Sequence, residues 1–131
     1  MTMQTTRTPS AVHGILEQFR ELGEVLAVAL VDRSGRAVAS AGDESATGAL
    51  ATAVARLLRG MPGDDAGSAM QRLFEESDEF TVPRSGVSSV ALLLRRVGED
   101  WALAAIWSSD TPLGRLRSFA RETASRLESV S

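Results

Sequence analysis

The fold is decided by one stretch of the chain, VLAVALVDRSGRAVASAG (residues 25–42). Its first seven residues are all apolar, a length and composition typical of a strand that is buried on both faces of a sheet. The next four, Asp32 to Gly35, are of the polar and glycine types that form turns, and residues 36–41 return as a second strand. The stretch therefore predicts a β-hairpin whose first strand lies inside a sheet.

Two helices flank this hairpin. The first is expected to begin near Thr8 and Pro9, because a hydroxyl can cap exposed amides and proline suits the first helical position, and to end at Gly23. Its apolar positions are Val12, Ile15, Leu16, Phe19 and Leu22. The second covers residues 44–59, with the apolar positions Ala46, Leu50, Ala53, Val54, Leu57 and Leu58. Its other sides carry glycine, alanine and threonine where a surface helix has charges, so we expect burial on a second side.

The second half of the chain predicts three strands and a last helix. Residues 60–67 have the composition of a flexible connector, and residues 70–80 suit either a helical tail or an edge strand. We favour a strand with its core at residues 74–82. Pro83 and Gly86 interrupt this strand, and edge strands tolerate such interruptions. Residues 87–97 and 101–107 are two apolar strands joined by the turn at 98–100. The last helix begins with Thr111 as its cap and Pro112 at its first position. Its core face is Leu113, Leu116, Phe119, Ala120, Thr123 and Leu127.

Composition excludes several classes of function. All 14 basic residues are arginine, cysteine is absent and His13 is the only histidine, so a P-loop lysine, a Schiff-base lysine and a typical zinc site are all missing. The net charge of −3 gives no drive toward nucleic acid. No apolar run is long enough to span a bilayer and the N-terminus lacks a secretory signal, so we expect the cytoplasm. We expect one domain over residues 1–131, with residues 1–8 flexible.

Residues that could suggest chemistry have simpler explanations. His13 lies on the first helix without a recognisable nucleophile or orienting carboxylate, and no G-x-S-x-G motif occurs, so we expect no catalytic residues, cofactor or metal. Asp32 and Asp43 suit a turn and a helix start. Trp101 and Trp107 should point to the same face of their strand and pack under a helix. The arginines expected to form a solvated side of the last helix, partly neutralised by Glu122 and Glu128, are Arg115, Arg117, Arg121 and Arg126.

Two segments carry a resemblance to a known family. They are ALVDRSGRAVASAG (residues 29–42) and IWSSDTPLGRLR (residues 106–117). The first resembles the strand, D-x-x-G turn and strand of the roadblock (dynein light-chain) family, and the second resembles its strand-to-helix junction. Together with the order of helices and strands, these segments give a resemblance over about residues 10–130. Within the family, the resemblance is to the bacterial MglB-like branch.

The resemblance implies a fold and a function. The fold is an α/β (α+β), roadblock/profilin-like, five-stranded antiparallel sheet flanked by three helices, in the order α-β-β-α-β-β-β-α. The function is a homodimer, formed through the second helix and third strand, that binds a small Ras-like GTPase and promotes GTP hydrolysis without being an enzyme itself. The residues expected at the dimer interface are Ala46, Ala49, Leu50, Ala53 and Leu57. Those expected to contact the GTPase are Thr52, Arg56 and Arg59.

Two other functions stay open at this point. A dimeric scaffold or adaptor of a GTPase or motor complex would use the same fold without an activating effect. A small-molecule sensor would need convergent polar groups inside an apolar cavity. The strand residues are mostly small and aliphatic, which favours a filled core over such a cavity.

Overall fold

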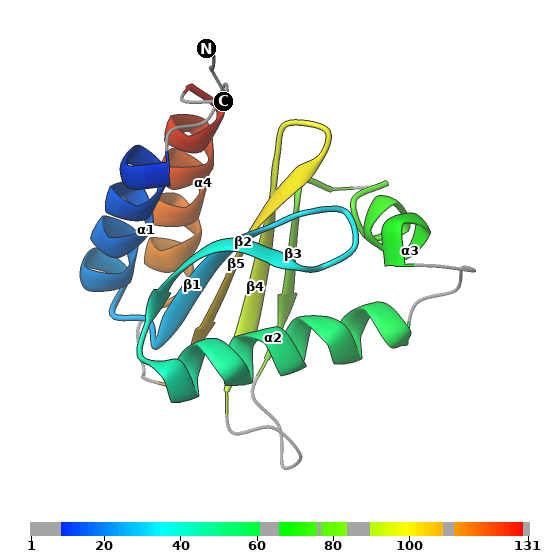
Figure 1. Cartoon of the computed structure of the whole chain (residues 1–131), viewed down its shortest axis with the longest axis horizontal. Coiled ribbons are helices and arrows are strands. Elements are labelled where there is room, and N and C mark those ends of the chain that lie inside the picture. Colours follow the sequence, from blue (N-terminus) through cyan, green and yellow to red (C-terminus); the bar gives the residue numbers. More distant parts are fainter. Residues whose placement is uncertain (1–8, 61–65, 76, 84–89, 109–111, 130–131) are drawn as a thin grey trace.

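The computed structural model describes residues 9–60, 66–75, 77–83, 90–108 and 112–129. Figure 1 shows helices on both sides of one sheet. The helices are α1 (Pro9–Gly23), α2 (Glu44–Arg59), α3 (Ala66–Leu73) and α4 (Leu113–Ser129). The strands are β1 (Ala27–Val31), β2 (Ala37–Gly42), β3 (Glu79–Val82), β4 (Ala91–Val97) and β5 (Trp101–Trp107). None of the described helices is long and apolar enough to cross a membrane.

The five strands form one antiparallel sheet in the order β2-β1-β5-β4-β3. Both predicted hairpins, β1–β2 and β4–β5, are present, and every residue of β1 is buried as a strand inside a sheet requires. The predicted fold class is therefore confirmed. Strand β3 lies at one edge and β2 at the other.

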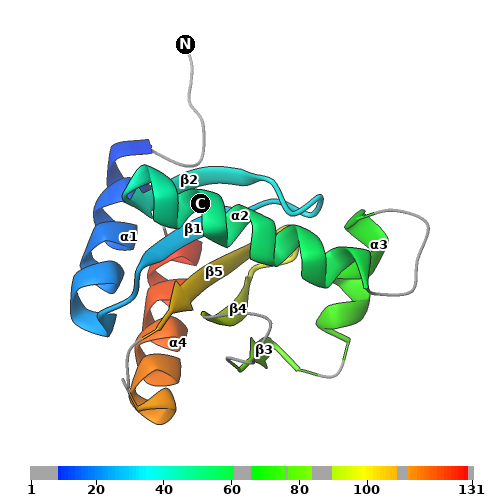
Figure 2. The same ribbon diagram turned by 90° about the horizontal axis from the view of Figure 1, so that it is seen from below.

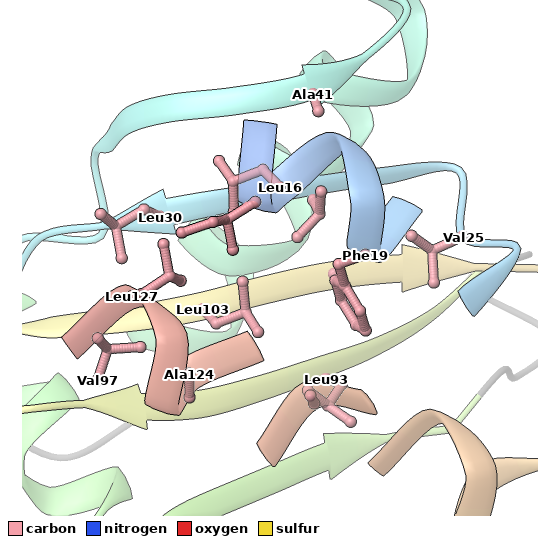
Figure 3. Close-up of a cluster of buried hydrophobic side chains, with 14 of the residues drawn as sticks. Leu16, Phe19, Val25, Leu30, Ala41, Leu93, Val97, Leu103, Ala124 and Leu127 are labelled. Atoms are coloured by element: carbon pink, nitrogen blue, oxygen red, sulfur yellow. The ribbon is translucent and has the colours of Figure 1, made fainter. Parts of the chain in front are cut away.

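Each face of the sheet carries its own hydrophobic core. Helices α1 and α4 lie side by side on one face, while α2 and α3 lie on the other (Figures 1 and 2). Alternate residues of the inner strands point to opposite layers, so Val28 and Leu103 face α1 and α4 while Ala29 and Ala104 face α2. Figure 3 shows the first core, in which Leu16, Leu103 and Leu127 meet between the sheet and the two helices. Trp101 and Trp107 both belong to this core, as the spacing predicted.

Two aspartates fix the hairpin turn and the start of α2. Asp32 Oδ1 accepts hydrogen bonds from Ser34 Oγ (2.6 Å), Ser34 N–H (3.0 Å) and Arg36 N–H (3.1 Å). Partial burial raises the pKa of the Asp32 carboxyl, but these three bonds outweigh that effect and the pKa lies below its ordinary value. Asp43 caps α2 by accepting a bond from Ala46 N–H at 2.7 Å. Both residues therefore have the local backbone roles that the sequence predicted.

Three details differ from the sequence analysis. Residues 66–73 form a short helix, α3, where a connector and the start of an ambiguous segment were predicted; residues 61–65 lie outside the described residues. The reason is a helical stripe, Ala69, Met70 and Leu73, which packs in the core beneath α2. Strand β3 is confirmed as an edge strand but is only four residues long. Leu22 and Leu113, both predicted in the core, are 50% and 42% exposed, since Leu22 is near the end of α1 and Leu113 is the first residue of α4.

Candidate protein-interaction surface

One side of helix α2 packs against the sheet, and small residues lie on the rest of its surface. Leu50, Val54 and Leu58 are buried against the sheet. Leu50, one of the five residues expected at a dimer interface, therefore points into the protein's own core. The other four lie along one side of the helix by helical spacing, with Ala49 exposed and the rest half-buried. We name these four the α2 flank: Ala46, Ala49, Ala53 and Leu57.

The outward face of α2 carries the residues that were expected to contact a GTPase. Thr52, Arg56 and Arg59 are all exposed. Thr52 Oγ1 donates a hydrogen bond to Gly48 O at 3.0 Å, so its hydroxyl is held against the helix. Neither arginine forms an ion pair with another described residue, and both lie in the last turn, where positive charge suits the helix dipole. Both arginines thus place a positive charge on the exposed side of α2.

A second surface is the free edge of strand β3, the last strand at one end of the sheet. Strand β3 pairs with β4 on one side, and among the described residues nothing pairs with its other side. An open edge presents unpaired backbone N–H and C=O groups, which natural proteins usually cover or pair. The edge strand and the α2 flank are thus two surfaces suited to contact with another chain.

Glu79, at the start of β3, is a buried charge that the sequence did not reveal. Its side chain is 5% exposed and lies between two cations: Arg95 Nη1 is 3.6 Å from Glu79 Oε1, and Arg117 Nε donates to Glu79 Oε2. Glu79 and Arg95 are cross-strand neighbours, and Arg117 is on α4. The carboxylate therefore holds the edge strand to both β4 and α4. Only the register of β3 brings these residues together, and no local pattern indicates that register.

The residues that the sequence singled out as possible chemical groups have separate positions in the described part of the chain. His13 is exposed on α1, and Asp32 and Asp43 accept hydrogen bonds from nearby backbone N–H groups. Among the described residues, no group of three His, Cys, Asp or Glu side chains could hold a metal ion.

All four arginines of α4 are exposed, as predicted, and three of them contact another side chain. Arg115 lies 5.4 Å from the ring centre of Phe119, Arg117 binds Glu79, and Arg126 binds Gln18 on α1. Glu128 accepts a hydrogen bond from Gly98 N–H at 2.9 Å, and the partial neutralisation by Glu122 and Glu128 stays a prediction. Two of the arginine contacts reach a neighbouring element, since Glu79 is on β3 and Gln18 is on α1, whereas Phe119 lies on α4 itself.

Comparison with known proteins supports this fold. The sequence matches no protein-family model and no protein of curated function. Among solved structures it is similar to Myxococcus xanthus MglB, with 21% identity over 99% of this chain and 93% of the other and a TM-score of 0.71. It is similar to an MglB with a tetrameric arrangement, with 20% identity over 99% and 93% and a TM-score of 0.68. A Roadblock/LC7 domain from Streptomyces avermitilis shares 14% identity over 86% and 91%, with a TM-score of 0.62.

These likenesses extend over 86–99% of the chain. The chain therefore has the roadblock fold, in the form found in MglB.

Proposed function

We propose that this protein is a homodimeric regulator of a small Ras-like GTPase, which activates GTP hydrolysis as the MglB-like resemblance implies. The observation that carries the proposal is the likeness to MglB over 99% of the chain. The exposed small residues of α2 and the open edge of β3 support it, because both are surfaces that a second protein can cover. The alternative is a scaffold with the same contacts and no effect on hydrolysis.

The proposed dimer uses the α2 flank and the free edge of β3. The flank consists of three alanines and Leu57, so two helices can approach closely there. A closed dimer is isologous, so both copies would offer the same flank and the same strand edge. A neighbouring MglB structure with a tetrameric arrangement supports self-association as a property of this fold.

A single charge on the α2 flank should separate the dimer. We expect Ala49→Glu to give a monomer at micromolar concentration, because an unpaired carboxylate would be forced into a desolvated contact. Ala49 is exposed in the protomer, so the substitution leaves the core intact. Ala51→Glu is the matched control, since Ala51 is equally exposed but lies on the opposite side of α2. Light scattering measures the mass, and circular dichroism checks that both variants are folded.

A dimer that survives Ala49→Glu would place the contact elsewhere. Separation by Ala51→Glu alone would move it to the other side of the helix. A wild-type protein that stays monomeric at micromolar concentration would remove the basis of the proposed assembly.

The GTPase proposal predicts a rate effect and a division of roles. Added to a Ras-like GTPase from the same genome, the protein should bind the GTP-like state and raise single-turnover hydrolysis, because it would stabilise the transition-state arrangement of the GTPase's own residues. Arg56→Ala and Arg59→Ala should weaken binding while changing the saturating rate by less than about threefold. Loss of an inserted arginine finger would instead cost on the order of a thousandfold.

Arg121→Ala is the control for these two substitutions, since Arg121 is exposed on α4, in the opposite layer. It should change neither binding nor rate. A collapse of the saturating rate with binding preserved would contradict the proposed mechanism and indicate an arginine finger. Binding without acceleration would favour the scaffold.

A further inference from the structure

Glu79 places a buried carboxylate on a strand that has few other contacts. Strand β3 is four residues long, and its pairing with β4 places Glu79 opposite Arg95 and Thr81 opposite Leu93. The connection between the two strands covers residues 83–90. Hairpin loops of about two to five residues fix a register through their geometry, and this connection is longer. Another feature must therefore select the register of β3.

The apolar residues of β3 select a face of the sheet but not a register. Phe80 and Val82 pack in the core under α2 and α3. A slip of one residue would turn both side chains to the opposite face, so their burial excludes it. A slip of two residues returns them to the same face, because side chains alternate along a strand with a period of two. The apolar pattern alone therefore leaves two-residue slips possible.

The carboxylate of Glu79 acts against these two-residue slips. In one direction Glu79 would lie opposite Leu93, and in the other opposite Val97. Both of those side chains are buried in the core under α1 and α4. A carboxylate moved there, away from Arg95, would carry a large desolvation cost. In the observed register, Glu79 Oε1 lies 3.6 Å from Arg95 Nη1, and Glu79 Oε2 accepts a hydrogen bond from Arg117 Nε.

The geometry of the Glu79–Arg95 pair suits the selection of a register better than the stabilisation of the fold. Glu79 Oε1 and Arg95 Nε are both buried, and neither forms a hydrogen bond with a described residue. A buried ion pair with unused donors and acceptors offsets little of its desolvation cost, whereas fixing a register is the best-attested role of such groups.

We propose that Glu79 is the positioning residue that holds β3 in one register, and so sets where the free edge of β3 meets a second copy of the chain. This inference rests on the proposed dimer, which uses that edge together with the α2 flank. A two-residue slip would move the edge by about 7 Å along the strand while the α2 flank stays in place. The two parts of the contact would then no longer fit the same partner.

Exchanging the buried pair for two leucines tests this role. The Glu79→Leu, Arg95→Leu double variant should stay folded, because apolar side chains of similar volume often replace a buried ion pair without loss of stability. A leucine can lie opposite Leu93 or Val97, so the variant should populate a second register, and its dimer dissociation constant should rise at least about tenfold. Cross-strand NMR contacts between the backbones of Thr81 and Leu93 report the register, and sedimentation at several concentrations measures the dissociation.

Two further variants serve as a control and as a second test. Asp78→Leu, Arg96→Leu makes the same exchange one position along, where the side chains are 51% and 44% exposed and 2.8 Å apart. Because an exposed ion pair contributes little, this variant should keep the single register and change the dissociation constant by less than about twofold. Glu79→Gln keeps the shape of the side chain and removes its charge, so it should change register and dissociation in the same direction as the double leucine variant, and it decides the question if that variant does not fold.

Three results would overturn the proposal. A single register in the Glu79 variants would mean that the carboxylate does not select it. A weaker dimer with an unchanged register would make Glu79 a mere contact, and a second register with an unchanged dissociation constant would separate the β3 edge from the dimer. A monomeric wild-type protein would instead contradict the proposed dimer, and the NMR contacts would still show whether Glu79 fixes the register, so the two failures are distinguishable.

Discussion

Leu103→Ala is expected to lower the free energy of unfolding by about 2–5 kcal/mol, which is the range for removing a large aliphatic side chain from a well-packed core. Leu103 is fully buried in β5, the middle strand of the sheet, and faces the core under α1 and α4. Side chains from several elements pack around Leu103 there, so the surrounding structure can close little of the cavity that the truncation leaves. Urea unfolding followed by circular dichroism, at one fixed protein concentration, measures the change.

Leu22→Ala provides the matched control for this truncation. The same atoms are removed from a side chain that is 50% exposed, so we expect a change within about 0.5 kcal/mol. Comparable losses from the two variants would contradict the division between the core and the surface described above.

Gly42→Ala is expected to be destabilising for a different reason. Gly42 has a φ of +129°, a backbone conformation that costs an L-residue about 1–3 kcal/mol. A Cβ at this position would also lie 2.8 Å from the backbone oxygen of Leu26 and 3.1 Å from the Cα of Ala27, on the neighbouring strand. Backbone atoms of a paired strand have little room to move, so this contact adds to the conformational cost. Thermal and urea unfolding should both show the loss.

Gly14→Ala is the control, because it makes the same chemical change where neither cause applies. Gly14 lies within α1, and a Cβ there would meet no atom within 4 Å. We expect this substitution to stabilise the protein by up to about 1 kcal/mol, as alanine favours a helix interior over glycine. If Gly42→Ala left the stability unchanged while Gly14→Ala raised it, the end of β2 would have to shift to accommodate the new methyl group.

The elements that the sequence predicted well have a strong local pattern. The apolar run at residues 25–31 and the turn after it predicted β1 and its hairpin, and the helical spacing of Val12, Leu16 and Phe19 predicted α1. Local backbone chemistry was equally informative at Asp43, since a carboxylate before a helix has few other roles.

The parts that the sequence did not predict depend on distant neighbours. Leu22 continues the stripe of α1, yet it lies at the rim of a cavity of about 110 Å³ between α1 and α4, where the packed neighbours end. Leu50 belongs to the apolar stripe of α2, and a stripe alone does not tell whether a side chain faces its own sheet or a second chain. Glu79 meets Arg117 from 38 positions away, through tertiary packing alone.

The separation of the two cores by the sheet has a consequence for how such a protein can change over time. The clusters on the two faces share no side chain, since each strand residue contributes to one layer only. Substitutions without shared partners have nearly additive effects on stability. Substitutions in the alanine-lined layer under α2, which includes Ala27, Ala29 and Ala104, should therefore combine nearly additively with substitutions in the layer of α1 and α4.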